Sequence, residues 1–477
     1  MVSRDFAFLS AGELRDLLRR REVSPVEIIA ATLAAIGASN AALGAFVTVT
    51  EASALAEARA AEQRLLAGEP LPPLFGVSVS IKDLEPMAGV RFTRGSLASD
   101  VIATEDALSV ERLRAAGAII VGKTNTAEFG FGTTGENRVF GVTRNPWDPR
   151  LTPGGSSAGA AASVAAGITP IAQGSDGGGS VRVPAAFCHV FGLKPTQGRI
   201  PRRLRGDQFW NVVATSTVGP IARTVRDAAV MLRVMAGAAE KAEFVMMKDA
   251  VPAFDEMLGR GVAGLRVALD IECCGAVEPV VAAGIREAAG VFQSLGARVE
   301  EIAFRPDPAD RLFDIFFDYF SARAYQSHGS FLDDPRSAAL LTDYVTDCLR
   351  RGKAQSAARH IEYLNRIGYY RHQIDALFAR YDLLLMPVAS VPPSPIGASP
   401  APAGGAAWSE PRWNFFRTHL FNLTGNPAAS LPIGFSPDDR PLAMQLVGRW
   451  GDDATVLAAA AFEEARPWRQ RLPAGSP

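Results

Sequence analysis

The segment Leu151–Ile200 reads LTPGGSSAGAAASVAAGITPIAQGSDGGGSVRVPAAFCHVFGLKPTQGRI. Residues 151–175 carry no charged side chain, and Asp176, three glycines, Ser180 and Arg182 follow them. The glycines have no Cβ, so their backbone N–H groups are open to a ligand. A serine directly after such a turn can combine a nucleophile and an oxyanion hole in one loop. Ser180 is therefore the leading candidate for a catalytic nucleophile.

Composition limits the classes of function. The 477 residues include 48% hydrophobic and 21% charged residues with a net charge of −1, which is ordinary for a globular protein. This charge gives no reason to expect nucleic acid or an anionic membrane as a partner. The four cysteines show no CxxC spacing, so we expect no disulfide framework, no zinc site and a reducing, cytoplasmic location. The N-terminus lacks the apolar core of a signal peptide.

Predicted strands and helices alternate along the chain, as in α/β proteins. Two capping boxes, Ser10 to Glu13 and Ser24 to Glu27, begin the first helices. Strands are expected at 74–81, 118–121, 169–173, 265–268, 298–302, 383–386, 428–433 and 442–447. Further helices are expected at 51–66, 104–116, 156–166, 224–235, 280–295, 310–378 and 454–466, and a long loop at 387–413 with Trp408 and Trp413.

Three short motifs match catalytic patterns but fit structural roles better. Residues 117–124, GAIIVGKT, match a phosphate-binding loop, yet the apolar AIIV favours a buried strand. Residues 155–159, GSSAG, match a nucleophile elbow, but no strand precedes them and no histidine stands in a recognisable triad setting. Cys188 and His189 are adjacent, and neighbours on a strand point to opposite faces. We therefore interpret Cys188 as a small buried hydrophobe.

Lys82 is the candidate base, because a serine hydroxyl needs a group that takes its proton. A lysine can serve only when burial among apolar groups lowers its pKa and leaves it neutral. Lys82 follows the apolar segment LFGVSVSI of residues 74–81. The alternative is a surface lysine that forms an ion pair with Asp83 or Glu85.

The sequence resembles the amidase signature family, whose motifs match in order along the chain. The matching segments are VSIKD (79–83), GS (95–96), AAGAIIVGKTNTAEF (115–129), FGVTRNPWD (140–148), TPGGSSAGAAASVAAG (152–167), GSDGGGSVRVPAAFCHVFGLKPTQGRI (174–200) and FNLTGNPAASLPIGF (421–435). The resemblance implies an α/β fold with a mixed central β-sheet flanked by helices on both faces. It also implies a single domain over 1–477, with catalytic motifs in 74–235 and a C-terminal part, 380–470, that completes the sheet and pocket.

The same resemblance implies a Ser–cis-Ser–Lys triad without a metal or cofactor. It places the acyl-forming serine at Ser180, the bridging serine at Ser156 and the base at Lys82. It implies that the N–H groups of Gly177, Gly178, Gly179 and Ser180 form the oxyanion hole. Ser157, Asp176 and Arg182 are expected to be supporting side chains, and Gly130 is expected to offer a backbone contact to the substrate.

Three of these positions carry open questions. Asp176 and Arg182 are expected to pair and to fix the shape of the loop, and the alternative is an ordinary surface ion pair. His189 stands where the family usually has glycine, which could alter the packing behind the nucleophile. Gly177 stands where the family often has a side chain, which makes the loop more flexible.

These residues indicate a serine hydrolase that cleaves the C–N bond of small-molecule amides, with carbamates or esters as further substrates through the same acyl-enzyme. Phe313, Phe316, Phe317 and Phe320 lie on one helical face, which we interpret as a core stripe. The alternative is a pocket wall for a bulky apolar or aryl group, to which Phe129, Phe131 and the tryptophans of the 387–413 loop could add.

Two other functions stay open. One is the glutaminase-like A subunit of a tRNA-dependent amidotransferase, which would need partner subunits and ATP. Its tyrosine-rich late segment is only loosely matched by HIEYLNRIGYYRHQ at 360–373. The other is a non-catalytic binding protein, which the intact Lys82, Ser156 and Ser180 argue against. A homodimer is left open as an assembly.

Overall fold

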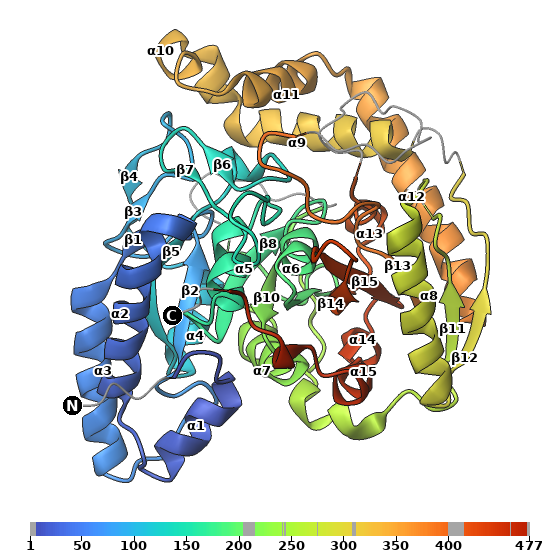
Figure 1. The fold of residues 1–477 in the computed structure, drawn as a ribbon. Helices are drawn as coiled ribbons and strands as arrows, with labels where there is room; N and C mark the ends of the chain where they lie inside the picture. Colours follow the sequence, from blue (N-terminus) through green and yellow to red (C-terminus); the bar gives the residue numbers. More distant parts are fainter. Residues whose placement is uncertain are drawn as a thin grey trace.

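A mixed sheet of eleven strands runs through the part of the chain that the computed structural model describes (Figure 1). The described residues are 6–203, 215–240, 242, 245–273, 275–307, 312–398, 415–457 and 459–474. From one edge to the other the strands are β1 (Phe46–Val49), β5 (Ile119–Thr124), β2 (Ser78–Lys82), β8 (Ile171–Asp176), β10 (Thr217–Ala222), β9 (Phe191–Lys194), β14 (Ala428–Phe435), β15 (Pro441–Gly448), β13 (Leu383–Pro387), β11 (Arg266–Leu269) and β12 (Arg298–Glu301).

Parallel pairs occur near both ends of this sheet. β2 pairs in parallel with β5 and with β8, and β11 pairs in parallel with β12 and with β13. The strands between these groups are antiparallel, including β10 against β8 and β14 against β15. Because β14 and β15 join the sheet beside β9, the C-terminal part of the chain lies next to the 151–200 segment.

Helices cover both faces of the sheet. On β13, Leu383 and Leu385 pack into one apolar cluster whereas Leu384 and Met386 pack into another, as expected when successive side chains point to opposite faces. The first cluster includes residues of α4 (Leu108–Ala115), α7 (Val225–Met235) and α8 (Pro279–Ser294). The opposite face is covered by α5 (Ala158–Ala165), α6 (Arg182–Phe187), α9 (Leu312–Asp333) and α12 (Ala357–Arg380). The predicted fold class is confirmed.

The N-terminal helices lie at the β1 end of the sheet (Figure 1). They are α1 (Ala11–Arg19), α2 (Pro25–Leu43) and α3 (Glu51–Leu66), and both predicted capping boxes are present, at Ser10 and Ser24. By length and composition α2 is apolar enough to cross a membrane, a property that core helices of soluble proteins share. Its buried residues, which include Ile28 and Ile36, pack in a cluster with α3 and β5.

The helical stretch expected at about 310–378 consists of several helices. These are α9, α10 (Pro335–Ala338), α11 (Asp343–Lys353) and α12. Asp334, Thr342 and Ser356 each cap the helix that follows, because their side chains accept backbone N–H groups of its first turn. The predicted helix at 454–466 is likewise divided, into α14 (Asp453–Leu457) and α15 (Ala460–Ala465).

Several boundaries also differ from the prediction. The strand expected from residue 74 begins at Ser78, since Gly76 adopts a φ of 71° in a turn before it. The helix expected from residue 156 begins at Ala158, which leaves both serines of the GGSS motif in the preceding loop. Strand β1 and the short pairs β3 (Arg91–Phe92) with β4 (Val101–Ile102) and β6 (Glu136–Asn137) with β7 (Gly141–Val142) were not predicted. Trp408 and Trp413 lie outside the described residues.

Candidate active site

Lys82 ends β2, and the alternation of side chains along this strand sets its direction. Val79 and Ile81 point into the apolar cluster beneath α4 and α7. Ser80 points to the other face, where its hydroxyl lies 3.3 Å from that of Ser163 in α5. Lys82 shares this second face. There its Nζ donates to Ser156 Oγ at 2.8 Å and to the carbonyl oxygen of Ser175 at 3.2 Å.

The Lys82 side chain is fully buried, with 0% of its surface exposed. Burial lowers the pKa of Lys82 to about 7, while Asp176 and Glu85 act in the opposite direction. Removal from water penalises the charged form of an amine. A lysine with this pKa is neutral in a large fraction of molecules at physiological pH.

Neither neighbouring carboxylate pairs with Lys82. Asp83 instead forms a buried ion pair with Lys123, whose Nζ lies 2.9 Å from Asp83 Oδ1. Glu85 pairs with Arg202 at 3.1 Å. The alternative of a surface lysine paired with Asp83 or Glu85 is therefore wrong, because each of these acids has another cationic partner.

Ser156 and Ser157 lie in the loop before α5, and the Gly155–Ser156 peptide bond is cis. Gly155 is packed tightly, since a Cβ there would lie 2.3 Å from the carbonyl oxygen of Thr134. Ser157 Oγ donates to the Ser175 carbonyl at 3.2 Å, and the Ser157 N–H donates to the Ser180 carbonyl at 3.2 Å. Ser157 thus links the Ser156 loop to both ends of the glycine loop.

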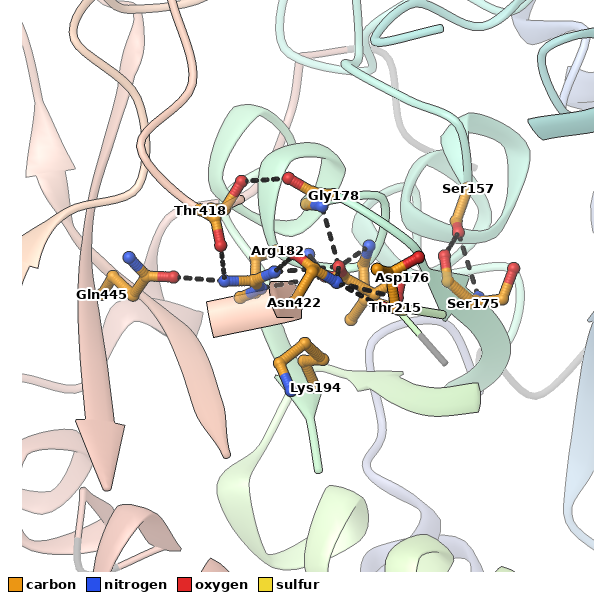
Figure 2. A network of polar contacts seen from close by, with 12 residues as sticks. Ser157, Ser175, Asp176, Gly178, Arg182, Lys194, Thr215, Thr418, Asn422 and Gln445 are labelled. Atoms are coloured by element: carbon orange, nitrogen blue, oxygen red, sulfur yellow. Dashed lines mark hydrogen bonds and ion pairs between the residues drawn. The ribbon is translucent and has the colours of Figure 1, made fainter. Parts of the chain in front are cut away.

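The glycine loop begins where β8 ends, at Asp176, and leads to α6, which begins at Arg182. Both side chains are fully buried, and Arg182 Nη2 lies 2.9 Å from Asp176 Oδ1 (Figure 2). Burial would raise the pKa of the Asp176 carboxyl, but Arg182 and then Asn422 hold this pKa well below its usual range. Asp176 and Arg182 therefore form a buried pair across the loop, and the alternative of a surface ion pair is wrong.

A cavity lies beside Ser180, and only part of the predicted oxyanion loop faces it. Gly177 and Ser180 are partly exposed and line it, whereas Gly178 and Gly179 are buried and do not. The Gly179 N–H donates to Asp176 Oδ1 at 2.7 Å, and the carbonyl of the same peptide unit, that of Gly178, accepts from Thr418 Oγ1. The structure therefore contradicts the predicted role of Gly179, because its N–H already has an acceptor.

The cavity beside Ser180 has a volume of about 150 Å³, and its wall brings together Ser156, Ser180, Gly177 and Gly130. A Cβ at Gly130 would lie 2.7 Å from Leu84 and 3.5 Å from Ser156 Oγ, which explains the absence of a side chain there. The remaining wall is mixed, and combines four rings, two aliphatic side chains, four hydroxyl residues and one arginine: Phe129, Phe131, Phe320 and His328, Leu84 and Ala324, Ser175, Thr215, Ser216 and Ser327, and Arg323.

The phenylalanine stripe of α9 has two roles. Phe313, Phe316 and Phe317 are buried in the core, as the favoured interpretation predicts. Phe320, one turn further, lines the cavity, as the alternative predicts. A wider cavity of about 510 Å³ adjoins the first and shares Arg323 with it.

Arginines outnumber carboxylates on the wall of the wider cavity, and two of them form ion pairs, Arg202 with Glu85 and Arg203 with Glu111. The charged side chains on its described wall are Glu85, Arg94, Arg202, Arg203 and Arg323.

The motifs set aside in the sequence have structural roles. Residues 117–124 contain β5, as expected. Cys188 is buried, but it ends α6 and is not on a strand, so the predicted reason for its separation from His189 is wrong. His189 adopts a φ of 57°, a conformation that favours glycine, and packs against Trp147 and Phe435. Among the described residues no group of three His, Cys, Asp or Glu side chains is placed to hold a metal ion.

Four residues that contact the glycine loop network were not identified from the sequence: Thr215, Thr418, Asn422 and Gln445. Asn422 belongs to the FNLTGNPAASLPIGF segment, which carried the resemblance without an assigned role. The motif also contains Thr424, Asn426 and Ser430, so its polar residues alone did not single out Asn422. Its partner could not be read from the sequence, because the two segments lie more than 240 residues apart.

Comparisons with known proteins match nearly the whole chain. A family model named Amidase matches residues 27–457. An acylamidase from Rhodococcus erythropolis is 34% identical over 485 residues, covering 100% of this chain and 99% of that protein. The A subunit of the glutamyl-tRNA(Gln) amidotransferase from Methylococcus capsulatus is 35% identical over 505 residues, with the same coverage. The crystal structure of a bacterial aryl acylamidase of the amidase signature family superposes with a TM-score of 0.92 at 30% identity, covering 99% of both chains.

Proposed function

The chain belongs to the Amidase family and is an amide-hydrolysing enzyme, and on that premise we propose that Ser180 is its nucleophile, with Ser156 and Lys82 as a proton relay. One observation carries this assignment. Lys82 is fully buried and has no carboxylate partner among the described residues, its Nζ lies 2.8 Å from Ser156 Oγ, and Ser156 lines the same cavity as Ser180. A neutral amine in that position can accept the proton of a hydroxyl.

The reaction proceeds through an acyl-enzyme. The Ser180 hydroxyl turns toward Ser156 and gives up its proton as Oγ attacks the amide carbon, while the Ser156 proton passes to Lys82 Nζ. The C–N bond then breaks, and the relay returns the proton to the leaving amine. Water attacks the acyl-enzyme, loses a proton to the same relay and releases the acid and the free Ser180 hydroxyl.

Backbone N–H groups stabilise the negative oxygen of each tetrahedral intermediate. The proposed donors are those of Gly177 and Ser180, since these two loop residues line the cavity. A single donor of this kind is worth about 3–4 kcal/mol in comparable sites. Asp176 and Arg182 act indirectly, by holding the loop in shape.

The preferred substrates are small amides with an aryl or bulky apolar group, with carbamates or esters as further substrates. Phe129, Phe131 and Phe320 support this choice, because their rings line the cavity that holds Ser180. Aromatic walls bury apolar substituents and stack on rings. The aryl acylamidase with the similar fold is in line with this proposal.

A second candidate is the A subunit of a tRNA-dependent amidotransferase. The relative from Methylococcus capsulatus favours it, since its identity of 35% is close to that of the acylamidase. The chemistry at Ser180 would be the same, but ammonia release from glutamine would depend on partner subunits and ATP.

One experiment tests both candidates. The purified chain alone, without ATP, is incubated with an aryl amide, and amine release is measured beside labelling by a serine-reactive aryl phosphonate. We expect turnover by the wild type, a single label on Ser180 located by peptide mass spectrometry, and neither in Ser180→Ala. A wild-type chain that is inactive alone and becomes active with partner subunits and ATP would support the amidotransferase instead.

A further inference from the structure

Asn422 connects the C-terminal part of the chain to the glycine loop. It lies in the short helix α13 (Leu420–Thr424), and 1% of its surface is exposed. Figure 2 shows its side chain directed at the loop between β8 and α6. Asn422 Nδ2 contacts the backbone carbonyl of Asp176 at 3.1 Å, Asp176 Oδ1 at 2.9 Å and the Thr215 carbonyl at 2.9 Å. Its Oδ1 accepts from Arg182 Nη2 at 2.7 Å.

The contact with the Asp176 carbonyl has a geometric consequence at Gly177. The peptide unit between Asp176 and Gly177 is planar and trans, since the cis peptide bond found among the described residues is the one between Gly155 and Ser156. In a trans unit the C=O and N–H groups point in opposite directions. When Asn422 draws the Asp176 carbonyl into the protein, the Gly177 N–H is therefore turned the other way, on the side where Gly177 lines the cavity.

The neighbouring peptide units follow the same rule. The Gly179 carbonyl accepts from the Val183 N–H at 2.7 Å, which turns the Ser180 N–H away from α6. The Gly178–Gly179 unit is held at both ends, by Thr418 and by Asp176, and its N–H is consumed within the loop. The Gly177 and Ser180 N–H groups, which belong to the two loop residues that line the cavity, are thus each oriented through the carbonyl of their own peptide unit.

We propose that Asn422 is a positioning residue that holds the Gly177 N–H in the orientation needed to bind the oxyanion. This inference rests on the proposed function, since it needs an intermediate on Ser180. Asn422 should therefore help to stabilise the transition state and should have little effect on substrate binding, because an oxyanion forms only as Ser180 attacks.

A merely structural role must be separated from this one, because Asn422 also contacts Arg182. Gln445 of β15 provides the matched control. Its Oε1 accepts from Arg182 Nη1 at 2.6 Å and its Nε2 donates to the Arg417 carbonyl at 3.3 Å, but it contacts no carbonyl of the glycine loop. Gln445→Met therefore perturbs the same arginine and leaves the Asp176 carbonyl in place.

The test compares Asn422→Leu with Gln445→Met in the full chain. The measurements are kcat and KM for an aryl amide, the inhibition constant of an aryl trifluoromethyl ketone, and the thermal midpoint. In the ketone complex Ser180 Oγ adds to the carbonyl carbon, the electron pair of the C=O bond moves onto oxygen, and the hydroxyl proton passes to the relay. The resulting oxyanion occupies the hole without a leaving group.

We expect Asn422→Leu to lower kcat by roughly 10–100-fold, part of the effect of removing a whole oxyanion donor. The inhibition constant of the ketone should rise by a similar factor, while KM changes less than about threefold. Gln445→Met should change kcat and the inhibition constant less than about threefold. Should Asn422→Leu fail to fold because leucine is larger than asparagine, Asn422→Ser adds no volume to the buried site and, being too short to reach the Asp176 carbonyl, is expected to show the same pattern.

Two results would overturn the inference: equal losses of kcat in the Asn422 and Gln445 variants, or an Asn422 variant whose kcat and ketone affinity stay within twofold of the wild type. Failure of the proposed function looks different. A wild-type chain that neither turns over the amide nor binds the ketone would refute Ser180 as the nucleophile, whatever the variants do.

Discussion

A buried lysine and a buried ion pair lie on either side of the Ser180 loop, and their surroundings differ in opposite ways. On one side the hydrogen-bond partners of Lys82 within the described part of the chain are neutral, the Ser156 hydroxyl and the Ser175 carbonyl. On the other side Asp176 and Arg182 neutralise each other and are surrounded by further donors and acceptors. Burial shifts an unpaired lysine toward its neutral form, whereas a satisfied pair keeps both charges.

The difference corresponds to what the proposed mechanism requires of each side. The base has to gain and lose a proton in every turnover, so its two charge states must be close in free energy, as a pKa of about 7 ensures for Lys82. The loop has to keep its N–H groups still while charge develops in front of them. A pair with both charges fixed gives that rigidity.

Replacement of the base should have the largest effect. Lys82→Met keeps an apolar side chain of similar length but cannot accept a proton, so we expect kcat for an aryl amide to fall by about 10²–10⁴-fold. Stability should stay within about 1 kcal/mol of the wild type, because no buried partner charge is left behind. Steady-state kinetics and urea unfolding measure the two effects, and wild-type turnover in the variant would eliminate Lys82 as the base.

Breaking the charged pair should have its main effect on stability. Arg182→Met leaves the Asp176 carboxylate buried without its cation, and removal of one partner from such a pair costs about 3–5 kcal/mol. Urea unfolding should show this loss, and the double variant Asp176→Asn, Arg182→Met should recover part of it. If the Arg182→Met variant were as stable as the Lys82→Met variant, the buried charge of Asp176 would not depend on Arg182, and the proposed difference between the lysine and the ion pair would be wrong.

The two sides also differed in how far the sequence predicted them. Lys82, Ser156 and Ser180 stand in local motifs, and alternation along β2 alone places Lys82 on the face toward α5. The burial of the Asp176–Arg182 pair depends on Asn422 and Gln445, which reach the loop through strand pairing of the C-terminal part. Gly179 was misassigned for the same reason, since three glycines look alike until the acceptor of each N–H is known.

The pH dependence of kcat/KM should follow the titration of Lys82. The pKa of Lys82 is lowered to about 7, so the neutral form gains as pH rises through this value and is lost below it. We expect kcat/KM to fall about tenfold per pH unit below that point, close to 100-fold at pH 5. A rate profile that is flat from pH 8 to pH 5 in a stable chain would contradict a lysine base.

A second buried lysine allows that acid limb to be assigned. Burial also lowers the pKa of Lys194 to about 7, and Lys194 lies beside the Asp176–Arg182 network (Figure 2). Its Nζ donates to the Pro195 carbonyl, and it does not line the cavity that holds Ser156 and Ser180. Lys194→Met should therefore leave the midpoint of the acid limb within about 0.3 pH units of the wild type. Because Lys82 and Lys194 share nearly the same pKa, a limb that disappears in this variant would show that the titration belongs to the loop side and not to the base.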